Sequence, residues 1–333
     1  MKRVVFKKIN SVEIDSYELG KLDCNCFRLR HLYSLISSGT ELLCLTGKMG
    51  EFSDVFPGYS AVGELIDGYE GSPYKKGDLF FTNGAHTEVV DIPKASAAEI
   101  LVPIDREHLV EATFLPLGKV ALHGLKRINV QLGDWVVVYG LGIVGNLAAQ
   151  LSKVATGGKV IAVDPVKSRR DIAESLGIIT FDPLSDGYVE KIMEITKGGA
   201  NAIIETSGSP SALNEAFKIA SYDAKISLVA GHYGTRQVDL KTDFQNKEIS
   251  LIAARRVDNL TRPSCYDRWT VFNYSKEIYE MIIKKTLKVR PLISHVTSPE
   301  EAPKKYLQLA KGDESVLGVI IDWTKQEGNK NEA

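Results

Sequence analysis

The sequence over residues 135–164 is WVVVYGLGIVGNLAAQLSKVATGGKVIAVD, and it predicts a strand, a helix and a second strand. The apolar, β-branched run 136–138 suits a strand that is buried on both faces. The amphipathic run after it predicts a helix, and the run 159–163 predicts a strand that ends at Asp164. Between the first strand and the helix lies the turn Gly140-Leu141-Gly142-Ile143-Val144-Gly145. This order is that of a βαβ unit with a glycine-rich turn.

Each glycine of this turn has a separate physical role. Gly140 permits the tight change of direction, Gly142 lets backbone N–H groups approach a pyrophosphate, and Gly145 lets the helix pack closely on the strand. The pyrophosphate would then lie at the positive end of the helix dipole. Asp164 follows Gly145 by 19 positions, where a carboxylate accepts hydrogen bonds from both ribose hydroxyls. The predicted dinucleotide contacts in this stretch are Gly140, Gly142, Ile143, Val144, Gly145 and Asp164.

The charges after the second strand bear on which dinucleotide binds. The carboxylate of Asp164 would repel a 2′-phosphate, so NAD is the expected cofactor. Three cations follow closely, Lys167, Arg169 and Arg170, and their charge leaves NADP possible. Arg169 is included among the predicted cofactor contacts.

The composition is that of a globular protein with one large domain or two of ordinary size. Of 333 residues, 44% are hydrophobic and 25% are charged, which suits a sizeable core. The net charge of −1 offers no basic surface for nucleic acid and no attraction to a membrane. No apolar run approaches the ~20 residues that span a bilayer, and the opening MKRVVFKKIN has no apolar run of signal length. Among Cys24, Cys26, Cys44 and Cys265 only the first two are close, so we expect reduced thiols and a cytoplasmic protein.

The order of strand and helix patterns predicts an inserted domain. Residues 1 to about 110 hold short, partly alternating apolar runs between turn residues, which suits a small barrel-like β domain. From Val136 onward, strands and helices alternate and give six strand candidates, the number in a complete doubly wound sheet. The tail holds two helices and a last strand over 316–322, which we expect to complete the first domain. The predicted domains are 1–116 with 277–333, and 117–276, with the cofactor in the cleft between them.

Six segments of the chain resemble, in order, blocks of the medium-chain dehydrogenase/reductase superfamily, which includes alcohol and polyol dehydrogenases. They are SSGTELLCLTGKMGEF…FPGYSAVGEL, KKGDLFF, GAHTEVVDIP, FLPLGKVALHGL, IIETSGSPSAL and PLISHVTSPEEAPKKYLQLAKGDES. The resemblance covers essentially the whole chain. It implies an α/β protein with a Rossmann doubly wound, parallel six-stranded sheet plus a GroES-like β-rich catalytic domain. It also implies hydride transfer between a nicotinamide and an alcohol or ketone.

The chain departs from the superfamily at the positions of the catalytic zinc ligands. Zinc members use a Cys, a His-Glu pair and a third Cys or Glu, and the corresponding positions here are Ser38, Tyr59-Ser60 and Leu115. A hydroxyl, a phenol and an alkyl chain do not supply the thiolate, imidazole or carboxylate that zinc requires. The family's four-cysteine structural lobe is missing as well. We therefore expect an enzyme without zinc, and the SSGTE block also resembles the branch that includes bacteriochlorophyllide dehydrogenases.

Without a metal, side chains must polarise the carbonyl and move the proton. Tyr59 is the candidate acid/base, and a nearby ammonium would lower its pKa from the ordinary value of ~10. The resemblance implies that Lys119 lies beside the nicotinamide and that Thr40 presents a hydroxyl to the reacting oxygen. Other roles stay open: Tyr59 filling the emptied metal site, Lys119 contacting a phosphate or ribose, and Thr40 capping the turn Glu41–Leu45.

The resemblance also assigns residues around the substrate and the nicotinamide. His86 falls on a substrate-pocket position, and His123 follows Lys119 by one helical turn and would share its face. A satisfied interior histidine is the alternative role for His123. The remaining cofactor contacts implied by the resemblance are Thr206, Ser207, Gly208, Gly231 and His232.

Arginines cluster in the segment AARRVDNLTRPSCYDRW. Such a run is typical of a solvated loop. The more specific hypothesis is a clamp in which Arg256 and Arg262 bind a carboxylate or phosphate of the substrate, because arginine forks match both groups. The substrate would then be anionic.

The sequence thus predicts a zinc-independent, NAD-preferring dehydrogenase of a secondary alcohol or ketone of polyol, sugar or cyclitol type. One alternative is an NADPH-dependent enone or quinone reductase of the same superfamily, in which solvent can deliver the proton. Another is a dinucleotide-binding protein without catalysis. The expected partners are a small-molecule substrate and a second copy of the chain, joined at the Rossmann sheet edge near Lys247–Arg256; neither nucleic acid nor membrane is expected.

Overall fold

The computed structural model describes residues 1–49, 54–96, 101–232, 237–254 and 269–325. The chain divides into two compact units, Met1–Pro116 with Leu260–Ala333, and Leu117–Asn259. We call the first the β unit and the second the Rossmann unit, and each is described by itself.

The second boundary between the units lies earlier than the 276/277 expected from the sequence. Helix α9 (Val271–Ile283) packs against α3 (Leu109–Ala112) and β7 (Val102–Pro103), which belong to the β unit. Tyr274 and Ile278 on α9 are fully buried. The periodicity of an amphipathic helix shows which of its faces is apolar, but not which unit that face packs against. The sequence pattern alone therefore could not assign α9 to the β unit.

The Rossmann unit contains one parallel sheet of six strands in the order β10-β9-β8-β11-β12-β13. Numbered from the first strand of the unit, this is the order 3-2-1-4-5-6 of a complete doubly wound sheet, as predicted. The strands are β8 (Val136–Tyr139), β9 (Val160–Val163), β10 (Ile179–Phe181), β11 (Ala200–Glu205), β12 (Ala220–Leu228) and β13 (Ser250–Ala253). Strand β13 forms the edge at which we predict a dimer, and that interface stays a prediction.

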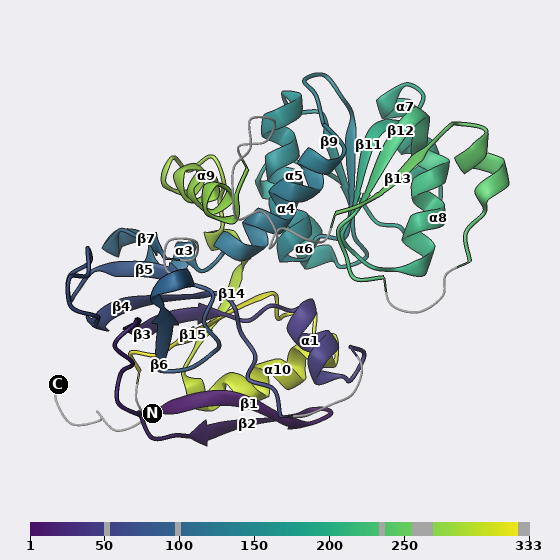
Figure 1. The fold of residues 1–333 in the computed structure, drawn as a ribbon. Coiled ribbons are helices and arrows are strands. Elements are labelled where there is room, and N and C mark those ends of the chain that lie inside the picture. Colours follow the sequence, from purple (N-terminus) through teal and green to yellow (C-terminus); the bar gives the residue numbers. More distant parts are fainter. Residues whose placement is uncertain (50–53, 97–100, 233–236, 255–268, 326–333) are drawn as a thin grey trace. The chain divides into compact units, whose positions relative to one another are not determined.

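Helices cover both faces of this sheet, with α4, α5 and α6 on one side and α7 and α8 on the other (Figure 1). Their bounds are α4 (Leu115–Arg127), α5 (Ile143–Thr156), α6 (Lys167–Ser175), α7 (Tyr188–Thr196) and α8 (Pro210–Ile219), and a single turn of π-helix covers Leu240–Gln245. The strand residues Val136, Val137 and Val138 have no exposed surface, as a strand covered on both faces requires. The carboxyl ends of the strands therefore lie along one edge, where such sheets bind ligands.

The β unit is built on a sheet of seven strands in the order β14-β15-β3-β4-β5-β7, with β6 paired to β3. Its remaining strands are β3 (Cys26–Leu35), β4 (Ala61–Asp67), β5 (Leu79–Thr82), β6 (Val89–Pro93), β14 (Ile293–Thr297) and β15 (Gly318–Asp322). Strand β15 pairs antiparallel with β3, so yellow strands from the tail lie beside purple ones from the start of the chain (Figure 1). The tail thus supplies two strands of this sheet, β14 and β15.

A hairpin and short helices close one side of this sheet. The strands β1 (Lys2–Lys8) and β2 (Ser11–Ser16) form a separate two-stranded sheet, and α10 (Ala302–Ala310) packs against β2 and α1 (Thr40–Leu45). The 3₁₀ helices of the unit are Arg106–His108, Arg290–Leu292 and Pro299–Glu301. Within the described ranges, no helix has the length and apolar character needed to cross a membrane.

Candidate functional site

The glycine-rich turn joins β8 to α5 and leaves room above the start of the helix. Gly140 has a φ of +88°, in the left-handed region that favours glycine. A Cβ at Gly145 would lie 1.8 Å from the carbonyl oxygen of Gly140, so any side chain there would push the helix off the strand. A Cβ at Gly142 would meet nothing within 4 Å. Helix α5 has no side-chain cap, and its first N–H groups fit a pyrophosphate in that open space.

Asp164 lies at the carboxyl end of β9 and ties that strand to the glycine-rich turn. Its Oδ2 accepts a hydrogen bond from the Leu141 N–H at 2.6 Å, and its Oδ1 accepts one from the Val166 N–H at 2.8 Å. The residue is 3% exposed. Each carboxylate oxygen can accept two hydrogen bonds, so one position on each oxygen is left for a ribose hydroxyl. The arrangement fits the expected ribose contact and also braces the turn.

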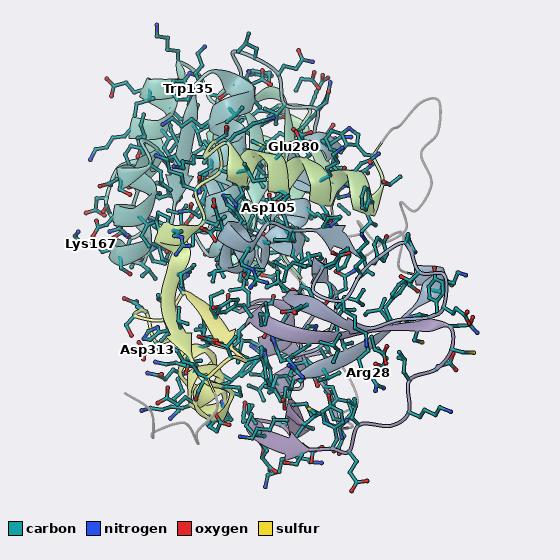
Figure 2. The ribbon with its side chains drawn as sticks, turned by 90° about the vertical axis from the view of Figure 1, so that its left-hand side faces the viewer. Arg28, Asp105, Trp135, Lys167, Glu280 and Asp313 are labelled. Carbon is teal, nitrogen blue, oxygen red and sulfur yellow. The ribbon has the colours of Figure 1, made fainter. Side chains whose placement is uncertain are left out.

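The three cations after Asp164 have different hydrogen-bond and ion-pair partners. Arg170 donates to the carbonyls of Asp164 and Pro165 at 2.6 and 2.8 Å. Lys167 points outward from α6 and pairs with Asp171 at 2.7 Å (Figure 2). Arg169 places Nη1 3.9 Å from Asp164 Oδ2, while its buried Nε has no hydrogen-bond partner among the described residues. Of the three, Arg169 has the donor that is left for a ligand.

Two loops at the carboxyl edge of the sheet lie next to the glycine-rich turn. Thr206 Oγ1 donates to the carbonyls of Tyr139 and Gly140 at 2.8 and 3.0 Å. A Cβ at Gly208 would lie 3.4 Å from the carbonyl oxygen of Gly231. The predicted contacts Thr206, Ser207, Gly208, Gly231 and His232 therefore lie in two adjacent loops of the Rossmann unit.

The structure adds Glu205 to these loops, a residue that the sequence analysis missed. Its carboxylate has no exposed surface, and it accepts hydrogen bonds from the backbone N–H groups of Ser207 at 2.8 Å and Gly208 at 3.0 Å. His232 Nε2 lies 2.8 Å from Glu205 Oε2, off the line of a hydrogen bond. The sequence did contain a signal for Glu205, because it is an acidic residue at the end of a buried parallel strand. A buried charge of this kind is rarely left unpaired.

Lys119 and His123 lie on α4 of the Rossmann unit. They are four residues apart and share one face of the helix, as predicted. Both are largely buried, at 6% and 9% exposure. Their roles toward cofactor and substrate stay predictions.

The four residues that the sequence analysis places at the superfamily's zinc positions all lie in the β unit. Ser38 precedes α1, Ser60 donates its hydroxyl hydrogen to the carbonyl of Thr113, and Leu115 has no exposed surface. Tyr59 donates to the hydroxyl of Ser37 at 2.5 Å. Within the described part of the chain, no three His, Cys, Asp or Glu side chains are grouped so that they could hold a metal ion. These donors do not fit zinc.

Thr40 and His86 take different places in the β unit. Thr40 is the first residue of α1 and is exposed; Gly39 is the N-cap, without a side-chain hydrogen bond, so Thr40 does not cap the helix. His86 has no exposed surface, with Nδ1 2.8 Å from Ser34 Oγ and Nε2 3.2 Å from Glu41 Oε2. A substrate contact by His86 would require these hydrogen bonds to break, and it stays a prediction. The predicted substrate clamp, Arg256 and Arg262, lies outside the described residues.

The sequence matches a known enzyme family. The profile of the zinc-binding dehydrogenase family matches residues 144–269. D-guloside 3-dehydrogenase of Escherichia coli strain K12 is 30% identical over 264 residues, which are 78% of this chain and 74% of that protein. The chain belongs to this family of medium-chain dehydrogenases. It is therefore an enzyme that uses a nicotinamide cofactor.

Solved structures confirm the fold of this dehydrogenase. Galactitol-1-phosphate dehydrogenase from Escherichia coli aligns with a TM-score of 0.82 at 17% identity, over 97% of this chain and 100% of that chain. A zinc-binding dehydrogenase from Sinorhizobium meliloti 1021 bound to NADP has a TM-score of 0.81 at 17% identity, over 96% and 98% of the two chains. An alcohol dehydrogenase from Escherichia coli CFT073 in complex with NADH gives 0.79 at 17% identity, over 97% and 99%. The α/β class with Rossmann and GroES-like parts is thus confirmed.

Proposed function

We propose that this dehydrogenase transfers hydride between NAD(H) and a secondary alcohol or ketone of a polyol, sugar or cyclitol, without a catalytic zinc. The observation that carries the proposal is the donor set Ser38, Tyr59, Ser60 and Leu115 at the family's zinc positions. One of these side chains is an alkyl group, and the Ser60 hydroxyl is already used by a backbone carbonyl. The similarity to an enzyme named D-guloside 3-dehydrogenase supports a sugar-like substrate.

In this proposal Tyr59 holds the proton that leaves or enters the substrate oxygen. Its phenol donates a hydrogen bond to the hydroxyl of Ser37, which is only 3% exposed. This hydrogen bond holds the phenol oxygen of Tyr59 in one position. Thr40 orients the reacting oxygen, and Lys119 supplies positive charge toward the cofactor. Bound NAD supplies the hydride acceptor, carbon C4 of its nicotinamide. General acid/base catalysis of this kind contributes about 10²–10⁴ in rate.

For the cofactor, the proposal follows Asp164. Its carboxylate is positioned for ribose hydroxyls and opposes the charge of a 2′-phosphate. The proposal extends to Arg256 and Arg262 as an anion clamp, which would add a carboxylate or phosphate to the substrate.

A second candidate, an NADPH-dependent enone or quinone reductase, is favoured by Arg169. Its Nε has no partner among the described residues, and a guanidinium at this end of β9 suits a 2′-phosphate. In such an enzyme hydride would add to an activated C=C bond and no acid/base side chain is needed.

The two candidates are separated by one pair of screens. Purified protein is incubated with NAD and a panel of polyols, sugars, sugar phosphates and cyclitols, and in parallel with NADPH and a panel of enones and quinones. The proposal expects reduction of NAD by a member of the first panel and a fall in that turnover of about 10²–10⁴-fold in Tyr59→Phe. Turnover confined to NADPH with an enone, unaffected by Tyr59→Phe, would replace it by the reductase.

A further inference from the structure

A group of buried polar side chains links distant segments of the β unit next to Tyr59. Glu41 comes from α1, Ser34 from β3, His86 from the segment before β6, Tyr306 from α10, and Trp323 from the residue after β15. None of them is more than 5% exposed. Buried polar atoms of this kind are costly unless each one has a partner, so their hydrogen bonds determine their protonation.

The hydrogen bonds fix the tautomer of His86. Trp323 Nε1 can only donate, and it donates to Ser34 Oγ at 2.9 Å. The other partner of the Ser34 hydroxyl among the described residues is His86 Nδ1 at 2.8 Å, so Ser34 donates to that nitrogen. Nε2 of His86, which lies 3.2 Å from Glu41 Oε2, then carries a hydrogen and donates it to Glu41.

Glu41 receives two more donors. Tyr306 donates its hydroxyl hydrogen to Glu41 Oε2, and the Ser37 N–H donates to Oε1 at 3.2 Å. Burial, and then the neighbouring Glu41 carboxylate, raise the pKa of Tyr306 well above its usual range, so this phenol stays a donor. The two carboxylate oxygens of Glu41 thus accept hydrogen bonds from three donors. Glu41 therefore anchors α1, α10 and the backbone of Ser37 at one point.

The anchored residue Ser37 is the hydrogen-bond partner of Tyr59. Ser37 is 3% exposed, its N–H is held by Glu41, and its hydroxyl lies 2.5 Å from the Tyr59 phenol. When Tyr59 gives its proton to a substrate oxygen, the Ser37 hydroxyl can turn and donate to the phenolate that forms. Such a charge-assisted hydrogen bond is about twice as strong as a neutral one. It requires Ser37 to be held in place.

We propose that Glu41 is a positioning residue for Tyr59, acting through Ser37. The inference rests on the proposed role of Tyr59. It adds a second role to the buried carboxylate, which would otherwise serve only to join the helices of the β unit. Glu41 itself is 4% exposed and acts on the proton only by fixing the Ser37 hydroxyl that faces the Tyr59 oxygen.

The test is a double-mutant cycle with Tyr59. Ser37→Ala removes the hydroxyl that faces Tyr59 and keeps the hydrogen bond from the Ser37 N–H to Glu41. Glu41→Leu removes the carboxylate that accepts this hydrogen bond. We expect each to lower kcat about tenfold or more, because a 1 Å misplacement of a reacting group can cost about 10²-fold, and to leave the Kd for NADH within about twofold. In the Tyr59→Phe background neither should lower kcat further. Glu41→Gln keeps a carbonyl oxygen for the Ser37 N–H and should retain most of kcat.

The control is Ser275→Ala on α9, which also removes a buried serine hydroxyl, here one that donates to the Val271 carbonyl at 3.0 Å. It should leave kcat unchanged. If Glu41→Leu and Ser37→Ala lower kcat by the same factor with and without Tyr59, the link to Tyr59 is wrong although the role of Tyr59 stands. If Tyr59→Phe alone keeps the wild-type kcat, the proposed function fails first. Should Glu41→Leu not fold, Ser37→Ala decides, because it leaves the Glu41 hydrogen bonds in place.

Discussion

His31 lies in the interior of the β unit with both ring nitrogens engaged. Nδ1 is 2.8 Å from the carbonyl oxygen of Thr87, and Nε2 is 3.0 Å from Thr82 Oγ1. Because a carbonyl only accepts, Nδ1 carries the hydrogen and the neutral ring satisfies both contacts. Burial lowers the pKa of His31 from 6.5 to about 4, the Thr87 hydrogen bond opposes this shift, and nearby His86 adds to it. His31 is therefore neutral in the folded protein at neutral pH.

This histidine predicts a loss of stability in mild acid. Below pH 6.5 His31 binds a proton in the unfolded chain, whereas in the folded chain it binds one only near pH 4. The contribution of His31 to the free energy of unfolding is therefore complete above pH 6.5 and is lost as the pH falls from 6.5 to about 4. The expected loss is about 3 kcal/mol across the window. Urea unfolding at pH 7, 5.5 and 4 measures it. His31→Gln should lose most of this slope, and an unchanged slope in the variant would show that other groups cause it.

Asp164 predicts the cofactor preference. Asp164→Asn keeps an acceptor for the backbone but removes the charge that opposes a 2′-phosphate. We expect NADH to bind the wild type at least tenfold tighter than NADPH, about 1.4 kcal/mol, and the variant to lose that difference. Fluorescence titration with both nucleotides measures it. Arg169→Met should weaken NADPH more than NADH; equal weakening would mean that Arg169 does not contact the 2′-phosphate.

At the scale of elements, the β8–α5 junction combines packing and ligand space in one short turn. Gly145 allows close packing, because its Cβ position is occupied by the Gly140 carbonyl. Gly142 faces open space and has a φ of −61°, which any residue can adopt. The fold thus requires glycine at position 145, and we expect the ligand to require it at position 142.

The two glycines predict opposite results for the same substitution. Gly145→Ala should lower the free energy of unfolding by about 1–3 kcal/mol, as overpacking does, and should lower NADH affinity as well. Gly142→Ala should leave stability within about 0.5 kcal/mol and still weaken NADH, because its methyl group enters the space for the pyrophosphate. Thermal unfolding and nucleotide titration of both variants measure this. A Gly142→Ala protein with wild-type NADH affinity would place the pyrophosphate elsewhere.

The elements of the Rossmann unit were predictable because their signals are local. The β-branched runs, the glycine-rich turn and the helix after it follow from neighbouring residues, and the structure confirms them. The site was less predictable. Glu41 and Tyr306 are 265 positions apart, and Glu205 meets His232 only because two loops converge. No periodicity encodes such contacts, so His86 was assigned to a substrate pocket while its buried partners were missed.

At the scale of the whole molecule, the chain keeps the fold of the zinc-binding dehydrogenases, and we propose that it differs from them in the residues at the metal positions. The structural neighbours align over nearly the full length, and the profile match includes the Rossmann unit from Val144 onward. Fold conservation does not require conserved chemistry, because function depends on the side chains placed at the site. The central claim is therefore that this family member works with a phenol where its relatives use a metal.

Metal content and turnover, measured on the same sample before and after chelation, test this claim. With the substrate found in the NAD screen, the claim predicts no stoichiometric zinc, a kcat unchanged by the chelator and no increase on adding zinc. One zinc per chain, with turnover lost on chelation and restored by zinc, would contradict it and return the proton chemistry to a metal.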